Sequence, residues 1–462
     1  MGFSHGSVHP TREEAKGVRI PMAAATPAKL SLLQEAMAFW EQAHPYNGGH
    51  AIRLSGRADP PALQAAIQRA CSRAGVGHLI LDRRSTRYHY EPAGAIELRE
   101  IRASGPLVGS LCAGITQEIN RPFGHGPEHP VRWLVVEDAA ADSHFLAAIY
   151  RHLAADSVSM RLLLRRVLGE YIGCPEPGDA RPLNVYPPPA ASVLRHHHRR
   201  LGYMRTFLRA AALYFRLRHA HRPRRARDGG TGSDFVIADT PEGLLDHLAA
   251  ACRSRRVTVS EAFLAALCGA VAGVTPLRRR HPRRRALAFV TFVDVRDEAS
   301  LDLADCFGMY LGHSTLVVDE PDAQEFGALL AEISGKMRSE RIAKHFLGPE
   351  WNYWMALRIG RRLAGRDPLG WYRKVYPIAG GLSSVRLNRS WFGGAGERIL
   401  EWIRFPPSGP VLPLVLAPTT LDGKLHLSLS YRRSALTHPE ALELVERLLK
   451  RLEGFSSGGR PE

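Results

Sequence analysis

Two apolar segments followed directly by a short polar motif constrain the fold of this chain most. Residues Val131–Glu137 and His144–Tyr150 have the length and the β-branched and aromatic content of strands, and the short polar stretch between them is typical of a hairpin turn. A helical pattern of apolar residues begins only a few residues after the second segment. The loop between strand and helix carries His152 and Asp156. The pattern therefore predicts a strand–loop–helix unit with polar groups at a sheet edge.

The positions of the two polar residues predict separate roles for them. His152 lies where the strand ends, so its imidazole can project beyond the sheet, and Asp156 lies where its carboxylate can cap the first turn of the helix. With 21 histidines in the chain, about one HxxxD pentad is expected by chance, so the strand–loop–helix context carries the prediction. A neutral imidazole is a suitable general base near pH 7. We therefore predict His152 as a catalytic base.

The rest of the chain mixes strand and helix patterns. Strand-like segments cover residues 50–54, 234–238, 286–295, 313–318, 411–417 and 425–431, and helix patterns cover 28–44, the segment after Asp59, 261–274 and the segment after Thr437. Two of the helix starts carry capping signals, an Asp before a proline pair and a Thr three residues before a Glu. The regular alternation of a doubly wound fold is absent. These patterns predict an α/β protein built from two mixed halves.

A proline-rich stretch predicts where the two halves are joined. The 462 residues are too many for one ordinary core, and residues 175–193 contain six prolines. We expect a flexible lead-in at 1–27, an N-terminal domain at 28–174, a proline-rich and basic linker at 175–233, and a C-terminal domain at 234–462. The lead-in lacks the apolar core of a secretory signal, and no apolar run is long enough for a spanning helix, so we expect a cytoplasmic protein.

The charge of the chain favours an acidic partner. The formal net charge is +17, which suits an acyl carrier protein, a phosphate-bearing cofactor, an anionic membrane or nucleic acid. Residues 195–227 hold eleven arginines and no acidic residue, which predicts a basic amphipathic helix. A solvated face, a docking site for an acidic carrier and a membrane-surface helix all remain open for it. The arginine cluster at 278–285 has no interleaved aromatic residues, so we expect no nucleic-acid binding.

The cysteines and histidines do not predict a metal site. The six cysteines are scattered without a CxxC pair, which favours reduced thiols. The run His196–His198 would place adjacent side chains about 100° apart on a helix, so they would not share one ion well. We expect no bound metal.

The segment from Arg151 to Ser157 resembles the HHxxxDG motif of the chloramphenicol-acetyltransferase-like acyltransferase superfamily, which includes the condensation domains of peptide synthetases. Other segments resemble that superfamily in the same order along residues 28–455. They are the opening strand and helix at 50–71, the start of the second half at 257–263, a strand end at 292–296, a glycine-containing element at 305–313, and the penultimate strand at 425–433. The chain is most similar to free-standing condensation-domain-like proteins.

This resemblance implies a fold and an activity. The expected fold is two α+β sandwich subdomains that form a V-shaped pseudo-dimer with a tunnel between them. The expected reaction moves an acyl group from a carrier-protein phosphopantetheine thioester, or from acyl-CoA, to an amine or hydroxyl acceptor, so that an amide or ester forms. No permanently bound cofactor is implied. The implied partners are an acidic carrier protein and a small acceptor molecule, and the chain is expected to be a monomer, with peripheral membrane contact left open.

The resemblance also implies roles for individual residues. His152 corresponds to the catalytic histidine, and Asp156 to a structural carboxylate that is ion-paired with Arg296 from the second half. Such a pair across the cleft would lower the Asp pKa and hold the loop. Ser383 and Ser384 correspond to a loop that faces the cleft, where a hydroxyl would donate to a developing oxyanion.

The chain departs from the family motif at three places. Arg151 replaces the first histidine, Ser157 replaces the glycine, and the element around Gly308 lacks the usual asparagine. A DFGWG segment is also absent, which disfavours the BAHD branch. These departures keep a second interpretation open, a catalytically degenerate scaffold that docks carrier domains.

Overall fold

The computed structural model describes most of the chain. The described residues are 27–82, 86–124, 126–138, 141–194, 203–224, 232–348, 353–354, 357–359, 362, 368–409 and 411–457. The predicted lead-in at 1–26 and the histidine run at 196–198 lie outside them.

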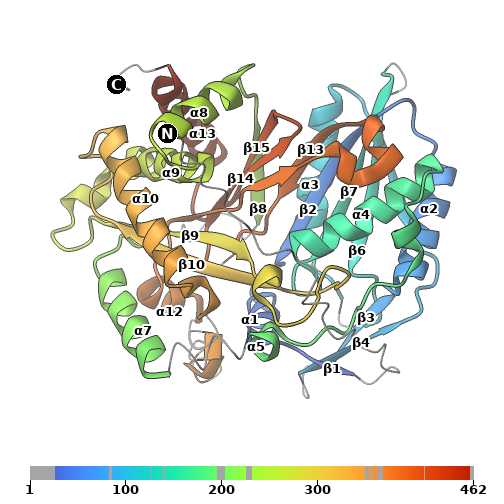
Figure 1. The fold of residues 1–462 in the computed structure, drawn as a ribbon, viewed down its shortest axis with the longest axis horizontal. Helices are drawn as coiled ribbons and strands as arrows, with labels where there is room; N and C mark the ends of the chain where they lie inside the picture. The colour runs from blue at the N-terminus through green and yellow to red at the C-terminus, as the bar shows by residue number, and fades with distance from the viewer. Residues whose placement is uncertain are drawn as a thin grey trace, which may run out of the picture.

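The N-terminal half is built on a five-stranded sheet. Its strands lie in the order β13 (Ile399–Phe405), β2 (Asn47–Ser55), β7 (Ser143–Arg151), β6 (Val131–Glu137) and β5 (Leu98–Arg102). Helices α2 (Pro60–Ala74) and α4 (Ser157–Ile172) bury their apolar residues on one face, and α3 (Leu107–Asn120) covers the other. Figure 1 shows this lobe on the right, with α3 behind the sheet. The predicted hairpin of β6 and β7 is present, with Leu134 opposite Ala147.

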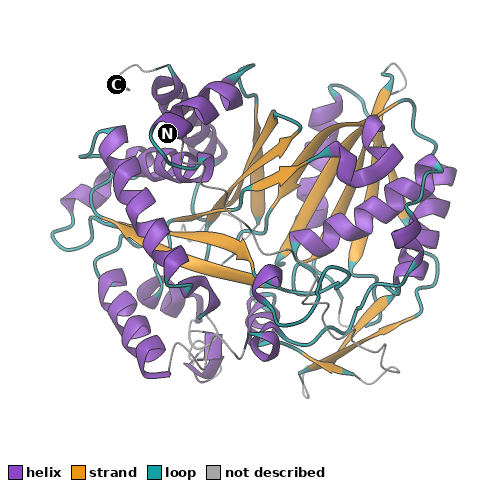
Figure 2. Ribbon diagram, in the orientation of Figure 1, coloured by secondary structure: helices purple, strands orange, loops and turns teal. Residues whose placement is uncertain are grey.

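The C-terminal half is built on a second, larger sheet. Its strands lie in the order β10 (Leu311–Val318), β9 (Leu287–Asp294), β11 (Gly380–Leu382), β14 (Leu414–Leu421), β15 (Lys424–Arg432) and β8 (Ser233–Ala238), and β12 (Val385–Leu387) pairs with β14. One face is covered by α8 (Leu244–Ser254), α9 (Val259–Val274), α10 (Phe326–Ile342) and α13 (His438–Ser456). Together the two halves give the mixed α/β architecture that the sequence predicts (Figures 1 and 2).

Smaller elements complete the fold, and the small third sheet and the helices next to it lie in the lower part of Figure 1. They are a three-stranded sheet of β1 (Ala28–Lys29), β4 (Arg87–Glu91) and β3 (His78–Asp82), the helices α1 (Leu32–Trp40), α5 (Ala190–Val193), α7 (Tyr203–Leu217) and α12 (Pro368–Val375), and the 3₁₀ helices η1 (Pro177–Ala180), η2 (Pro276–Arg280), η3 (Arg296–Glu298), η4 (His345–Leu347) and η5 (Arg389–Arg398). Helix α7 falls within the predicted basic segment and is shorter than that segment.

Strand β13 crosses from the C-terminal half into the N-terminal sheet. It pairs antiparallel with β2, so that Trp402 lies opposite Ile52 and Arg404 opposite His50. Trp402 is fully buried, and with Phe392 of η5 it joins the core between the sheet and α4. Strand β13 thus lies within the C-terminal domain predicted at 234–462 and completes the sheet of the N-terminal half.

Capping side chains explain two helix boundaries that the apolar pattern misplaced. The helix predicted at 261–274 begins two residues earlier, because Thr258 caps α9 and forms a reciprocal capping box with Glu261. Ser31 caps α1 with Gln34, so the predicted helix over 28–44 is shorter, and its first residues pair with β4 instead.

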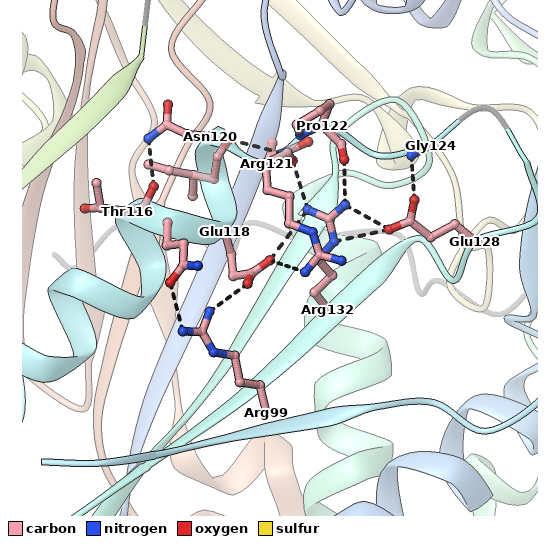
Figure 3. A network of polar contacts seen from close by, with 12 residues as sticks. Arg99, Thr116, Glu118, Asn120, Arg121, Pro122, Gly124, Glu128 and Arg132 are labelled. Carbon is pink, nitrogen blue, oxygen red and sulfur yellow. Dashed lines mark hydrogen bonds and ion pairs between the residues drawn. The ribbon is translucent and has the colours of Figure 1, made fainter. Parts of the chain in front are cut away.

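A buried carboxylate ties α3 to the sheet beneath it. Figure 3 shows Glu118 of α3 among three guanidinium groups. Its oxygens lie 2.9 Å from Arg99 of β5, 3.3 Å from Arg121 and 3.6 Å from Arg132 of β6. Glu118 is only 2% exposed, so its charge is compensated by these neighbours rather than by water.

Replacing Glu118 by glutamine should therefore destabilise the fold by about 1–3 kcal/mol, because the arginines lose the buried carboxylate that they share. Urea unfolding would measure the change. The control is Glu100→Gln, at an exposed position on β5. The free energy of unfolding of this variant should stay within about 0.5 kcal/mol of that of the unsubstituted protein. Equal stability of the two variants would contradict the role of Glu118.

Among the described residues, no single helix is long and apolar enough to cross a membrane. Of these residues, only α8 and α9 taken together reach that length and composition, and the two helices are bent by 103° at the break between them.

Candidate active site

The candidate site is built on the loop that joins β7 to α4. All nine residues of β7 are buried, so the strand is held on both faces up to the loop. The Asp156 carboxylate ends the loop by accepting a hydrogen bond of 2.9 Å from the Ser159 backbone N–H, which caps α4. His152 is thus held between a fixed strand end and a capped helix, as the sequence predicts for this segment.

The imidazole of His152 is oriented by the turn of its own loop. Its Nδ1 lies 3.1 Å from the Ala155 carbonyl oxygen. A carbonyl only accepts, so Nδ1 carries the hydrogen and Nε2 keeps a free lone pair. Burial lowers the pKa of His152 to about 4, although the Ala155 carbonyl and the Asp156 charge act in the opposite direction. His152 is therefore a neutral imidazole at pH 7, in the tautomer that accepts a proton at Nε2.

The Asp156 carboxylate forms an ion pair with Arg296 that joins the two halves. Its oxygens accept two hydrogen bonds from Arg296, of 2.9 and 3.0 Å, and another of 2.9 Å from the Tyr310 backbone N–H. Burial acts to raise the pKa of Asp156, but the Arg296 charge and these hydrogen bonds outweigh it and hold that pKa below its usual value. Arg296 is also bonded to Ser159 Oγ and to Asp294. Asp156 thus has the contacts of a structural anchor rather than of a proton relay.

The segment around Gly308 fastens the same loop from the other side. The Gly308 carbonyl accepts from the Asp156 backbone N–H at 3.1 Å and from Ser159 Oγ at 2.9 Å, and its N–H donates to that hydroxyl at 3.0 Å. A Cβ at this position would lie 2.9 Å from Cγ of Pro187, so a side chain would force the two segments apart. Gly308 therefore holds the loop through backbone contacts. These contacts form even though this chain lacks the asparagine of the family motif.

The two substituted motif positions make contacts of their own. Arg151 forms a buried ion pair of 2.7 Å with Glu41. Ser157 Oγ lies 3.3 Å from Nε2 of His50, whose Nδ1 accepts a hydrogen bond of 3.0 Å from the indole of Trp402. Because Nδ1 accepts, neutral His50 carries its hydrogen on Nε2 and donates to Ser157. Burial, together with nearby Arg404, holds the pKa of His50 well below its usual value.

A cavity of about 520 Å³ lies beside this loop, between the two halves. Both sheets and the helices α1, α7 and α12 contribute to its wall. The polar groups nearest the loop that line it are His50, Tyr150, His152, Ser157, Ser383 and Arg404. The remaining wall is mainly aliphatic and aromatic, so the cavity is an apolar chamber with polar groups around His152.

The structure separates the two predicted oxyanion serines. Ser383 lines the cavity, and its Oγ accepts a hydrogen bond of 3.1 Å from Arg404 Nη1. Ser384, the next residue, is exposed and does not line the cavity. Its neighbour Val385 starts β12. Of the two, only Ser383 lines the cavity that His152 also lines.

Arg404 and His50 are site residues that the sequence analysis did not identify. Arg404 is buried and donates to Thr419 Oγ1 at 3.0 Å and to the Pro418 carbonyl at 3.2 Å. Burial lowers its pKa to about 9. Both residues interrupt apolar strands, which is a signal for a cavity-facing position, but only the pairing of β13 with β2 places them side by side. In the described part of the chain, no group of histidine, cysteine, aspartate and glutamate side chains could hold a metal ion.

The two sandwich-like halves, joined through β13 and the Asp156–Arg296 pair, define the class to which this structure belongs. The chain has the fold of the condensation domains of peptide and polyketide synthetases, as the sequence resemblance predicts. No protein-family model and no curated protein matches its sequence.

Three solved structures illustrate this structural similarity. The condensation domain of the Monacolin K polyketide synthase MokA is 14% identical, with a TM-score of 0.66, over 94% of this chain and 98% of that one. The X-domain from teicoplanin biosynthesis is 18% identical, with a TM-score of 0.58, over 96% and 97%. The epimerization domain of tyrocidine synthetase B, third module, is 16% identical, with a TM-score of 0.60, over 97% and 99%.

These likenesses establish the fold and leave the reaction to the site. One of these structures is a condensation domain, another an epimerization domain, and the X-domain is also described in a complex with OxyB. Since one fold serves proteins described so differently, the activity of this chain has to be argued from its own residues.

Proposed function

We propose that this protein is an acyltransferase that moves an acyl group from a thioester donor to an amine or hydroxyl acceptor. The observation that carries the proposal is the imidazole of His152, which is neutral, has Nδ1 occupied by a carbonyl, and lines the cavity between the two halves. A general base needs these properties: a free lone pair, a fixed orientation and access to the acceptor.

The proposed reaction uses no group outside the chain and its two substrates. Nε2 of His152 takes the proton of the acceptor as its nitrogen or oxygen bonds to the thioester carbonyl carbon, and the carbonyl electrons move onto oxygen. The intermediate then collapses, the C–S bond breaks, and the leaving thiolate takes the proton back from the imidazolium. An amide or ester and a free thiol result.

Ser383 is proposed to stabilise the oxyanion of that intermediate. Its Oγ already accepts a hydrogen bond from Arg404, so its own hydrogen is available for another acceptor. The buried Arg404 charge would polarise that hydroxyl in a setting from which most water is excluded, where such donors have the largest effect.

The proposed donor is an acyl-phosphopantetheine on a carrier protein, with acyl-CoA as the other thioester of the same chemistry. The net charge of +17 supports an acidic donor. We propose that the reaction takes place in the cytoplasm and without a resident cofactor.

The test is to incubate the protein with an acyl-loaded carrier protein and a mixture of amines and alcohols, and to follow both by intact mass. Loss of the acyl mass from the carrier, matched by an acylated acceptor, is expected. A second arm replaces the carrier by acyl-CoA. If neither donor loses its acyl group although the carrier binds, the docking scaffold becomes the better interpretation, which the substitutions at Arg151 and Ser157 favour.

A further inference from the structure

We propose that the cavity binds a long linear apolar chain, fatty acyl or alkyl, that extends from His152 to a mouth beside α7. The placement of its reacting end at His152 rests on the proposed function. The binding of the chain rests on the cavity alone.

The distribution of polar groups supports an apolar ligand. Away from the loop, the wall consists of side chains such as Met37, Trp40, Leu213, Leu217, Tyr372 and Val415. Of the polar side chains in this part, three bond to one another, whereas the buried Trp40 Nε1 and Tyr372 hydroxyl have no hydrogen-bond partner among the described residues. His313 lies 2.9 Å from the Tyr353 hydroxyl and 3.4 Å from that of Tyr376, which in turn lies 2.6 Å from Thr315 Oγ1. A ligand here therefore meets a mainly apolar wall, with polar groups concentrated at the end near His152.

Helix α7 marks the end of the cavity away from His152. Phe207 and Tyr214 line the cavity and are still 52% and 42% exposed, so the cavity reaches the molecular surface between them. Ala210 and Ala211, on the turn between these aromatic residues, also line it. Their small side chains leave space under the helix. The lining residues thus form a passage that begins at the surface of α7 and ends at the loop that carries His152.

The size of the cavity fits a chain rather than a small acyl group. A volume of about 520 Å³ lies within the range of pockets that enclose whole ligands, which is about 300–1,000 Å³. An acetyl group would leave most of this apolar wall uncovered. Each further methylene buried in such a wall contributes about 0.8 kcal/mol, or about a fourfold gain in affinity.

The experiment measures binding rather than catalysis. Primary alcohols of increasing length, from butanol to dodecanol, are titrated into His152→Ala protein by calorimetry. We expect the affinity to rise about fourfold per methylene in the series. An affinity that does not rise with chain length would overturn the proposal.

A matched pair of variants locates the chain under α7. Ala211→Phe fills the passage and should remove the gain for the longest alcohols while leaving short ones unchanged. Ala212→Phe, at the next position but exposed and outside the lining, should bind the whole series as the parent does. Equal effects of the two substitutions would contradict the placement. If Ala211→Phe lowers the melting temperature, the smaller change Ala210→Leu takes its place.

The outcomes separate this proposal from the proposed function. Binding that depends on chain length, without acyl loss from any donor, would retain the chain site and reject the acyltransferase. Acyl transfer that is equally fast for acetyl and lauroyl groups, together with alcohol affinity that does not change with length, would retain the acyltransferase and reject the chain site.

Discussion

Replacing His152 with alanine is expected to lower the acyl-transfer rate by about 10²–10⁴-fold, because the acceptor loses the group that removes its proton. The structure gives His152 the geometry for this role: Nδ1 bonded to the Ala155 carbonyl and Nε2 free. The measurement is the rate of acyl loss from a loaded donor, followed by intact mass. Donor binding should change little, so the loss should fall on kcat.

The control for this substitution is His247→Ala. His247 is an exposed residue on α8, and its replacement should leave the rate within a factor of about two, which corresponds to about 0.4 kcal/mol in activation free energy. Circular dichroism and melting temperature should be the same for both variants. If the His152→Ala protein transfers acyl groups as fast as the control, His152 is not the base.

The dependence of the rate on pH follows from the lowered pKa of His152. Because that pKa is about 4, the base is already neutral at pH 6, and the contribution of His152 to the rate should be constant from there to pH 8. The rate should decline only as the pH falls toward 4, where the imidazole becomes protonated. A rate that rises through pH 6.5 would indicate an ordinary, solvated histidine instead.

Replacing Arg296 with methionine is expected to destabilise the protein by about 3–5 kcal/mol, the usual effect of leaving one partner of a buried ion pair without compensation. Asp156 has no exposed surface, and Arg296 is 9% exposed. The lost contacts include both hydrogen bonds to the carboxylate and the bond to Ser159. Urea unfolding measures the change in free energy.

Two further variants test whether the effect comes from the pair. Arg285→Met removes an ion pair with Glu320 in which both side chains are about half exposed, and it should change stability by no more than about 1 kcal/mol. Asp156→Asn combined with Arg296→Met should be more stable than Arg296→Met alone, because no unpaired buried charge remains. Additive effects of the two substitutions would rule out coupling between these residues.

Acid unfolding gives a second view of Asp156. Its folded-state pKa is lowered, so the stability that it contributes is present above the unfolded value of about 3.9 and is lost as the pH falls through the folded pKa. Asp156→Asn should be less stable than the parent at neutral pH, and the difference should shrink below about pH 4. A constant difference across this range would contradict the linkage.

Local features of the chain could be predicted because their causes lie close together in the sequence. The apolar runs of β6 and β7, the cap that Asp156 supplies to α4 and the capping box at Thr437 each depend on residues a few positions apart. The start of α9 was misplaced because the apolar pattern begins at residue 261, whereas the helix begins after the capping box of Thr258 with Glu261.

The sequence by itself determined the strand–loop–helix unit that carries His152 and, by its likeness to a family, the condensation-domain fold. The tertiary structure alone decided that β13 joins the N-terminal sheet, which brings Arg404 opposite His50 across 354 positions of sequence. It also decided that Ser383 faces the cavity and Ser384 does not. Burial of Trp402 in the N-terminal core selects that pairing. Such a long-range contact depends on how two surfaces fit, and no local pattern along the chain records it.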